Sequence, residues 1–247
     1  MAEKYVPSVQ VSRISGQRID RMVRALVGAV VSGSTRTVFR HTPLNFDRAN
    51  GVDTQGADSL RALVTPVHDA VGRSRYEPVS VKHFHFALQQ VPAPLERWSF
   101  IDIGSGKGRA VLLATAQPFR RVVGVELDPA LHAAAQQNLQ RYRGPRRCEQ
   151  VELQCADATT VPLPAGDLVI FFYNSFGGAL LRRFLDHLEA SLRSEPRRLL
   201  FFYSNPVERE QVDGRAAFTP CFDGSSPYDL IWWGCRRLVT YRAGSWP

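Results

Sequence analysis

The sequence predicts an α/β protein whose core is a doubly wound, mostly parallel seven-stranded sheet with an antiparallel last strand, plus a helical N-terminal extension. Three observations carry this prediction. After residue 97, short apolar runs alternate with segments of helical periodicity, which is typical of a parallel sheet covered by helices on both faces. A glycine-rich turn joins the first of these runs to the first helix. The last two runs follow one another with no helix of normal length between them, which indicates an antiparallel pair.

The predicted elements follow in order from residue 98. Strands are expected at residues 98–103, 121–126, 149–155, 167–173, 197–204, 218–222 and 230–241. Helices are expected at residues 107–117, 129–142 and 178–194. The second helix has clear boundary signals, because Asp128 suits the N-cap position and Pro129 the first helical position. Gly144-Pro145 then ends it.

The first 75 residues are expected to form a helical extension, and residues 76–247 the main domain. Residues 18–32 carry one apolar stripe at helical spacing. Residues 45–56 are too polar for a core, so the charged side chains of Asp47, Arg48 and Asp53 are expected to line a substrate mouth or to lie in a solvated loop. A further helix is expected at about residues 79–90, after the turn at Tyr76-Glu77-Pro78.

The composition allows a full hydrophobic core and leaves a surplus of positive charge. Of the 247 residues 44% are hydrophobic, and the net charge is +8. The basic residues are almost all arginines in scattered pairs, so nucleic-acid binding is possible but not favoured. The apolar run at residues 22–31 is interrupted by Arg24 and is far shorter than the roughly 20 residues of a membrane span, so no membrane association is expected.

The cysteines and histidines indicate neither a disulfide framework nor a metal site. The four cysteines show no C-x-x-C spacing, and they are expected to be reduced and buried in a cytoplasmic protein: Cys148, Cys155, Cys221 and Cys235. His83 and His85 share a predicted helix, but positions i and i+2 do not face the same way. The sequence therefore predicts no bound metal.

The glycine-rich turn Asp102-x-Gly104-x-Gly106-x-Gly108 is the most informative local motif. It follows an apolar strand and opens a helix, which is the arrangement of a pocket for a nucleotide-like cofactor. A phosphate-binding P-loop requires Gly-x-x-x-x-Gly-Lys-Ser/Thr, and a dinucleotide fingerprint requires glycine in place of Arg109. The carboxylate of Asp102 suits a cofactor that carries an ammonium group and would repel a pyrophosphate.

This turn resembles motif I of the class I S-adenosylmethionine-dependent methyltransferases, Asp/Glu-x-Gly-x-Gly-x-Gly. The resemblance covers most of the chain from about residue 76, because further segments at residues 124–129, 151–158 and 167–176 look like the later motifs of the family. It implies S-adenosylmethionine as the cofactor, with Glu126 binding the ribose hydroxyls and Asp157 the adenine amino group. In this family an N-terminal extension commonly forms a lid over the cofactor cleft, and residues 1–75 are long enough for that role.

The resemblance also implies which residues form the site. The expected cofactor-binding residues are Tyr76, Asp102, Gly104, Ser105, Gly106, Gly108, Glu126, Leu127, Asp157, Ala158 and Asn174. The expected catalytic residues are Tyr173, Asn174 and Phe176, because Tyr173-Asn174-Ser175-Phe176 resembles a contracted Asn/Asp/Ser-Pro-Pro-Tyr/Phe motif of amino-group methyltransferases, without its prolines. The alternative interpretation is a turn asparagine and a core phenylalanine.

Tyr76-Glu77-Pro78 resembles the Tyr-x-Pro element of histone-lysine methyltransferases of the seven-strand class and of their smaller bacterial and mitochondrial relatives, although an ordinary proline turn is the alternative. The expected function is therefore methyl transfer to a nitrogen or oxygen of a small molecule or of a protein side chain. RNA methylation and a non-catalytic cofactor-binding module are the alternatives. His83, His85 and Glu77 are candidates for a general base, and the sequence predicts no oligomeric state.

Overall fold

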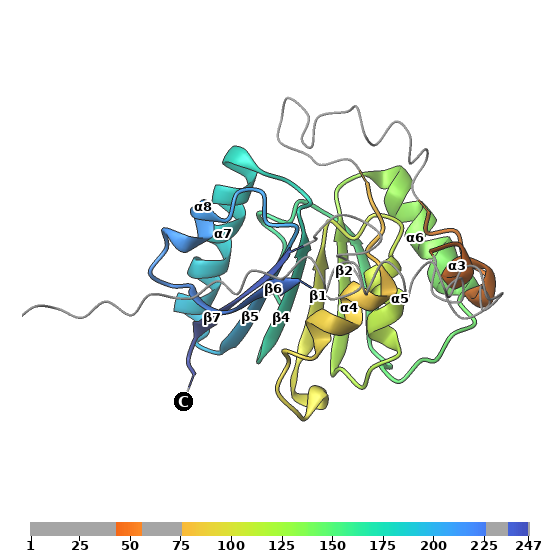
Figure 1. Cartoon of the computed structure of the whole chain (residues 1–247), viewed down its shortest axis with the longest axis horizontal. Coiled ribbons are helices and arrows are strands. Elements are labelled where there is room, and N and C mark those ends of the chain that lie inside the picture. Colours follow the sequence, from red (N-terminus) through yellow and green to blue (C-terminus); the bar gives the residue numbers. More distant parts are fainter. Residues whose placement is uncertain (1–42, 56–75, 226–236, 247) are drawn as a thin grey trace, which may run out of the picture. The chain divides into compact units, whose positions relative to one another are not determined.

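The computed structural model describes residues 43–55, 76–225 and 237–246 (Figure 1). These residues belong to one compact unit, which begins at Pro43. The helix predicted at residues 18–32 and the first part of the strand predicted at residues 230–241 lie outside the described residues.

A seven-stranded sheet with the order β3-β2-β1-β4-β5-β7-β6 forms the centre of this unit. Its strands are β1 Ser99–Ile103, β2 Arg121–Glu126, β3 Val151–Cys155, β4 Leu168–Tyr173, β5 Arg198–Ser204, β6 Thr219–Ser225 and β7 Arg237–Gly244. Strands β1 to β5 pair in parallel, whereas β7 pairs antiparallel with both β5 and β6. The predicted doubly wound, mostly parallel seven-stranded sheet with an antiparallel last strand is confirmed. The strand order reverses between β1 and β4, and open sheets of this kind bind ligands beyond the carboxyl ends of the strands at that point.

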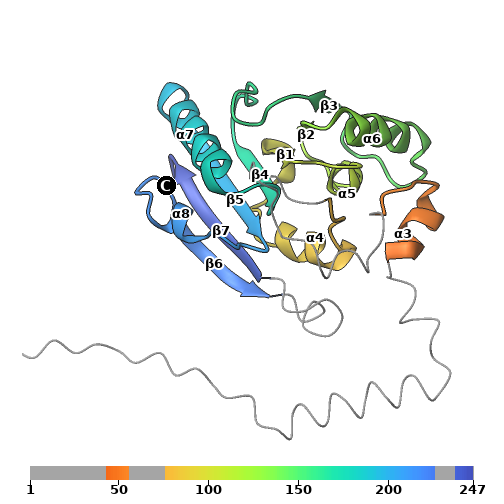
Figure 2. The same cartoon turned by 90° about the horizontal axis from the view of Figure 1, so that it is seen from above.

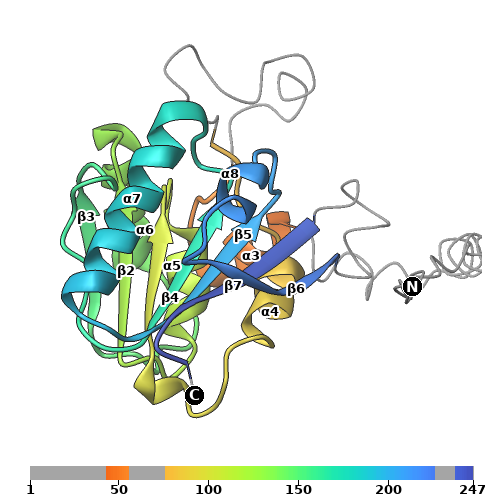
Figure 3. The same cartoon turned by 90° about the vertical axis from the view of Figure 1, so that its left-hand side faces the viewer.

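Helices cover both faces of the sheet. They are α3 Pro43–Asn50, α4 Val81–Leu88, α5 Arg109–Thr115, α6 Pro129–Arg141, α7 Gly178–Ser194 and α8 Glu210–Asp213, with a short 3-10 turn at Leu95–Arg97. Figures 2 and 3 show α4 and α7 on opposite sides of the sheet. Because neighbouring residues of a strand point to opposite faces, Phe171 of β4 packs against Phe84 of α4, and Phe172 packs against Phe184 of α7.

Helix α7 illustrates how the pattern of the sequence determines an element. Its buried side chains recur at helical spacing and face the sheet: Leu181, Phe184, Leu185, Leu188 and Leu192. The limits predicted for this helix, residues 178–194, are the observed ones. Although it is the longest helix of the described part of the chain, neither it nor any other described helix is long and apolar enough to cross a membrane.

Two expectations about burial are wrong. Residues 45–55 are not simply a solvated loop, because α3 covers Pro43–Asn50 and the side chains of Asp47, Val52 and Thr54 are buried, whereas Arg48 and Asp53 are exposed. Cys155 and Cys221 are exposed, because they lie on β3 and β6, the two edge strands of the sheet. Cys148 is buried as expected, and Cys235 lies outside the described residues.

Candidate functional site

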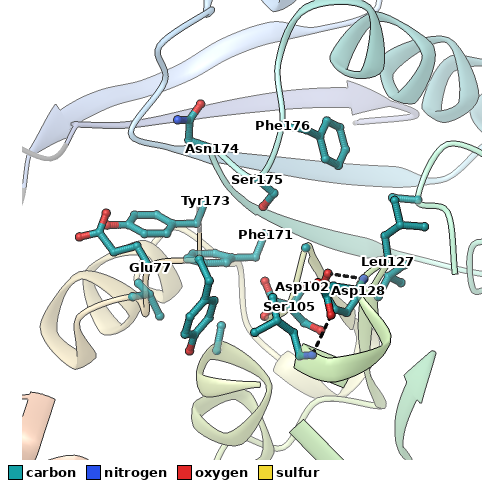
Figure 4. Close-up of a pocket in the computed structure, with 18 of the residues that line it drawn as sticks. Glu77, Asp102, Ser105, Leu127, Asp128, Phe171, Tyr173, Asn174, Ser175 and Phe176 are labelled. Atoms are coloured by element: carbon teal, nitrogen blue, oxygen red, sulfur yellow. Dashed lines mark hydrogen bonds between the residues drawn. The ribbon is translucent and has the colours of Figure 1, made fainter. Parts of the chain in front are cut away.

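A pocket of about 630 Å³ lies at the carboxyl ends of β1, β2, β4 and β5. Its volume is in the usual range for small-molecule and cofactor sites. Most of the residues expected to bind a cofactor line it: Tyr76, Asp102, Gly104, Ser105, Glu126, Leu127, Asp157, Ala158 and Asn174. Tyr173 and Phe176 line it as well, so the structure brings together residues that are up to a hundred positions apart in the sequence. Figure 4 shows ten of the lining residues by name.

The turn between β1 and α5 forms one wall of the pocket. Gly104 and Gly106 have φ values of 70° and 53°, which β-carbon-bearing residues adopt rarely. A Cβ on Gly104 would overlap with the side chain of Ser175, and one on Gly106 with the ring of Tyr76. The two glycines thus allow protein side chains to approach the turn. Gly106 and Gly108 are not among the residues that line the pocket, which differs from their expected direct contact with a cofactor.

Glu126 is the last residue of β2, and its side chain connects the glycine turn to the segment that follows β2. One oxygen of its carboxylate accepts a hydrogen bond from the backbone N–H of Gly106 at 2.7 Å, and the other from the N–H of Asp128 at 2.9 Å. Asp128 in turn caps α6 by accepting hydrogen bonds from the N–H groups of Ala130 and Leu131. Because an ionised carboxylate has about four acceptor positions, Glu126 keeps capacity for donors from a ligand.

Asp102 and Ser105 provide polar groups at the buried end of the pocket. Burial, together with the neighbouring charge of Glu126, raises the pKa of Asp102 to about 8. The hydroxyl oxygen of Ser105 is buried and has no hydrogen-bond partner among the described residues, although it belongs to a residue that lines the pocket. Buried polar atoms are normally paired.

Asp157 and Leu127 lie at the more open end of the pocket. The carboxylate of Asp157 accepts a hydrogen bond from the backbone N–H of Thr159 at 2.8 Å and lies 3.7 Å from Arg183. Burial opposes ionisation, but these hydrogen bonds and the charge of Arg183 lower the pKa of Asp157 overall. Leu127 is one of the few exposed large apolar side chains in the described part of the chain, with 52% of its surface accessible. An apolar surface beside a carboxylate suits a flat heteroaromatic ring with an amino group.

Two asparagines stand at the ends of neighbouring strands. Asn174 follows β4 and Asn205 follows β5, and both line the pocket with positive φ values of 44° and 52°. Asparagine tolerates this conformation better than most residues, and such strained positions concentrate at functional sites. Asn205 was not expected from the sequence. The available signal was an asparagine directly after a predicted strand at the same edge of the sheet.

Phe176 is both a pocket residue and a residue that packs against the hydrophobic core, which were the two alternatives for it in the sequence. It lines the pocket, and its ring also packs edge-on against Phe172 at a centroid distance of 4.9 Å and against Phe184. In Figure 4, Asn174 and Phe176 lie on the side of the pocket opposite Asp102 and Ser105. A ligand that spans the pocket would therefore contact both groups.

Residues 46–54, which we call the N-terminal strap, are held to the glycine turn by a buried polar cluster. The carboxylate of Asp47 accepts hydrogen bonds from Thr54 and from Arg109, the first residue of α5. The guanidinium of Arg109 also donates to the hydroxyl of Thr54 at 2.6 Å. The hydroxyl of Tyr76 donates to the carbonyl of Thr54 at 2.7 Å, so the strap also fixes a side chain of the pocket.

The candidate bases differ in their surroundings. His83 of α4 is buried, and its Nε2 lies 2.9 Å from the hydroxyl of Ser204 at the end of β5. His85 is partly exposed to solvent, and the burial of the rest of its side chain lowers its pKa. Of the three candidates, Glu77 lines the pocket and the two histidines do not. Within the part of the chain that the structure describes, no group of three or more His, Cys, Asp or Glu residues could hold a metal ion.

Residues 100–195 match the model of a protein family described as a methyltransferase domain. This segment contains most of β1, all of β2 to β4, the glycine turn, Glu126, Asp157 and Asn174. The chain is therefore similar to methyltransferase domains over the part that forms most of the pocket. A search of curated proteins finds no match.

Solved structures with a related chain path include several methyltransferases. Magnesium protoporphyrin IX methyltransferase from Synechocystis PCC 6803, with bound S-adenosylmethionine, is 19% identical over 67% of this chain and 76% of its own, with a TM-score of 0.46. The glycopeptide N-methyltransferase MtfA, complexed with the same cofactor, is 16% identical over 71% of this chain and 99% of its own, with a TM-score of 0.48. These identities and TM-scores are too low for the function of either protein to be transferred to this chain.

Proposed function

We propose that this protein is an S-adenosylmethionine-dependent methyltransferase. The observation that supports this most strongly is the combination of the buried Asp102, the glycine turn and Glu126 around a single pocket. The match of residues 100–195 to a methyltransferase-domain model supports the same proposal. The finer assignment, transfer to a nitrogen or oxygen of a small molecule or of a protein side chain, is part of the proposal.

The charges that line the pocket fit this cofactor better than a nucleotide. Among the described residues, five acidic side chains line the pocket, those of Glu77, Asp102, Glu126, Asp128 and Asp157, against one cationic side chain, that of Arg109. S-adenosylmethionine carries an ammonium and a sulfonium group and no phosphate. A pyrophosphate would be repelled by such a lining, whereas a ligand with a net positive charge would be attracted.

The residues suit the parts of the cofactor in order along the pocket. We assign Asp102 to the ammonium group, Glu126 to the ribose hydroxyls, and Asp157 with Leu127 to the adenine. Gly104 and Ser105 line the pocket beside Asp102, while Gly106 and Gly108 act through the backbone of the turn. When bound, the cofactor supplies an activated methyl group on its sulfonium.

The protein has to align the acceptor with that methyl group and exclude water, since in-line displacement on a sulfonium needs little more. Asn174 supplies a carbonyl oxygen that can accept a hydrogen bond from an amine or hydroxyl and so direct its lone pair. Tyr173 and Phe176 flank the same part of the pocket and provide apolar walls. An amine of a small molecule and a lysine side chain are the two acceptors that this arrangement suits best.

Nucleic-acid methylation is not favoured by any feature of the described residues. The pocket is acidic, and several arginines are paired with carboxylates, as in the pairs Arg121–Glu152, Arg198–Asp167 and Arg237–Asp223. An arginine in such a pair is less available to a phosphate backbone.

Methyl transfer is tested with isotopically labelled S-adenosylmethionine, offered together with lysate proteins or with a metabolite extract and followed by mass spectrometry. We expect one class of acceptor to gain a labelled methyl group. With that acceptor, Asn174→Gly should lower kcat about 10²-fold, of the order found for the loss of one preorganised polar contact, and should leave cofactor affinity nearly unchanged. Glycine suits the positive φ at this position, so the backbone is preserved.

Asn205→Gly is the comparison variant, because it removes the same side chain from the same backbone conformation on the neighbouring strand. An equal loss of kcat in both variants would contradict the specific role of Asn174. Cofactor binding without transfer to any acceptor would instead support a non-catalytic module.

A further inference from the structure

The end of α6 and the loop that follows it carry a cluster of exposed arginines. We call these side chains the arginine patch, and they are Arg141, Arg143, Arg146 and Arg147. Between Pro129 and Val151 the sequence has a single acidic residue, Glu149. This stretch of the surface therefore has a local excess of positive charge.

No described carboxylate neutralises the arginine patch. In the part of the chain that the structure describes, none of its four guanidinium groups forms an ion pair, and those of Arg141, Arg143 and Arg147 form no hydrogen bond. Other surface arginines differ, because Arg121 and Arg237, for example, pair with carboxylates. The positive charge of the patch therefore remains available to a ligand.

The backbone beneath the patch is fixed by its contacts with α3 and α6. The ring of Tyr142 is buried and stacks on Phe46 of α3 at a centroid distance of 6.4 Å. The backbone N–H of Arg143 donates to the carbonyl of Asn50 at 3.0 Å. The guanidinium of Arg146 donates to two carbonyls at the C-terminal end of α6 and lies over the ring of Tyr142. Because the loop is held in this way, a ligand that binds to it has less conformational freedom to remove.

Helix α6 connects two regions of opposite charge. Its N-cap Asp128 and its first residue Pro129 line the acidic pocket, whereas its last residue, Arg141, belongs to the arginine patch. The helix has 13 residues, so the two regions are about 20 Å apart. A molecule that contacts both must carry negative charge at one point and positive charge at the other.

This requirement distinguishes between the anionic partners that could bind arginines. A nucleic acid that extended from the patch to the pocket would bring phosphates to the acidic lining, which would repel them. The one aromatic side chain of the loop, Tyr142, is buried, so a base has no ring there on which to stack. Membrane surfaces are usually bound by cations beside exposed apolar side chains, and the large apolar side chains exposed among the described residues, Leu127 and Val207, lie outside the loop.

We propose that the arginine patch docks an acidic segment of a protein whose lysine side chain is methylated in the pocket. A protein can present carboxylates to the patch and an ammonium group to the acidic pocket, which the polyanions cannot. The docking depends only on the charges of the patch, whereas the placement of the lysine rests on the proposed function. The partner is thus a protein with a run of Asp or Glu residues about 20 Å from the acceptor lysine.

Fluorescence anisotropy with a labelled oligoglutamate peptide and the full chain tests the docking. Wild type should bind the peptide, and added salt should weaken the binding. The double variant Arg143→Gln/Arg147→Gln should bind it about five- to tenfold more weakly, as expected for the loss of two exposed charge pairs. Both side chains are exposed and form no bond in the described part of the chain, so the fold should be preserved.

The matched control is the double variant Arg97→Gln/Arg182→Gln. It removes the same number of positive charges from exposed arginines that also form no described ion pair but lie outside the patch, and it should bind the peptide like wild type. An equal loss of affinity in both double variants would show an effect of net charge alone and overturn the proposal. Wild type that bound oligouridylate or phosphatidylserine vesicles but not the peptide would also overturn it.

Calorimetry with S-adenosylhomocysteine on the same samples separates this inference from the proposed function. Wild type that binds S-adenosylhomocysteine but not the peptide would overturn the docking and leave the proposed function intact. With a protein acceptor found by isotope labelling, the patch variant should raise KM about five- to tenfold and leave kcat and the affinity for S-adenosylhomocysteine unchanged. An unchanged KM for that acceptor would overturn the role of the patch in binding it.

Discussion

Asp102 is the carboxylate whose ionisation the fold controls most strongly. Burial and the charge of Glu126 raise its pKa from an ordinary value of 3.8 to about 8. Between these values the folded protein binds more protons than the unfolded chain, so this group contributes stability at low pH that is lost as the pH rises towards 8. Asp102 is therefore mostly protonated at neutral pH, and an ammonium group beside it would favour its ionised form.

Cofactor affinity should consequently depend on pH through Asp102. We expect the affinity for S-adenosylhomocysteine to rise between pH 6 and 7.5, by at most about tenfold per pH unit, with release of a proton on binding. Calorimetry in buffers of different ionisation enthalpy measures both quantities. Methylthioadenosine lacks the ammonium group and should show neither effect, and Asp102→Asn should abolish both. An affinity that is independent of pH in wild type would contradict the assignment of Asp102.

At the residue scale, the sequence predicts the groups that belong to the family motifs and misses those that contact them from elsewhere. Asp102, Glu126 and Asp157 stand at strand ends, where the pattern of the chain places them in one pocket. In the sequence, Arg109 is informative only because it occupies the position where a dinucleotide-binding fingerprint requires glycine. Its burial depends on Asp47 and Thr54, more than fifty residues earlier, and no local pattern indicates such a contact.

The N-terminal strap is the element that connects the beginning of the described chain to the cofactor turn. Asp47 and Arg109 form a buried ion pair at 3.1 Å, with side chains 10% and 1% exposed. Breaking one partner of such a pair leaves an uncompensated buried charge. Asp53 of the same strap pairs instead with Lys107 at 3.3 Å, and its side chain is 76% exposed.

Loss of the Asp47 carboxylate should therefore destabilise the fold much more than loss of the Asp53 carboxylate. Asp47→Ala is expected to lower the free energy of unfolding by about 3–5 kcal/mol, whereas Asp53→Ala should lower it by less than about 1 kcal/mol. Urea unfolding curves of the two variants measure the difference. If Asp47→Ala were as mild as Asp53→Ala, the strap would not be held by the buried pair.

At the element scale, most boundaries could be predicted because helical and strand patterns are long and regular. Helix α7 and strand β2 have the predicted limits. Helix α3 could not be predicted from its polar composition, because its buried contacts are made across the molecule, by Asp47 with Arg109 and by Phe46 with Tyr142. Helix α8 was missed because four residues are too short to show a helical period.

At the scale of the whole molecule, the order of strands explains why residues far apart in sequence share one pocket. Parallel strands end at the same edge, and the reversal of strand order between β1 and β4 separates the loops that follow them. The sequence could predict this architecture from alternation alone. It could not predict the acceptor, because specificity depends on the shape of the pocket around Asn174, Asn205 and Glu77, and not on the pattern of the strands.

The central claim is that the pocket bounded by Glu126 binds S-adenosylmethionine, and calorimetric titration of Glu126→Ala with this cofactor tests it most directly. The variant removes the carboxylate expected to bind the ribose and also leaves the N–H of Gly106 without its acceptor, so affinity should fall by about tenfold or more. Glu152→Ala on β3 is the matched control, because Glu152 pairs with Arg121 and does not line the pocket, and it should bind like wild type. Unchanged cofactor affinity in Glu126→Ala would contradict the account.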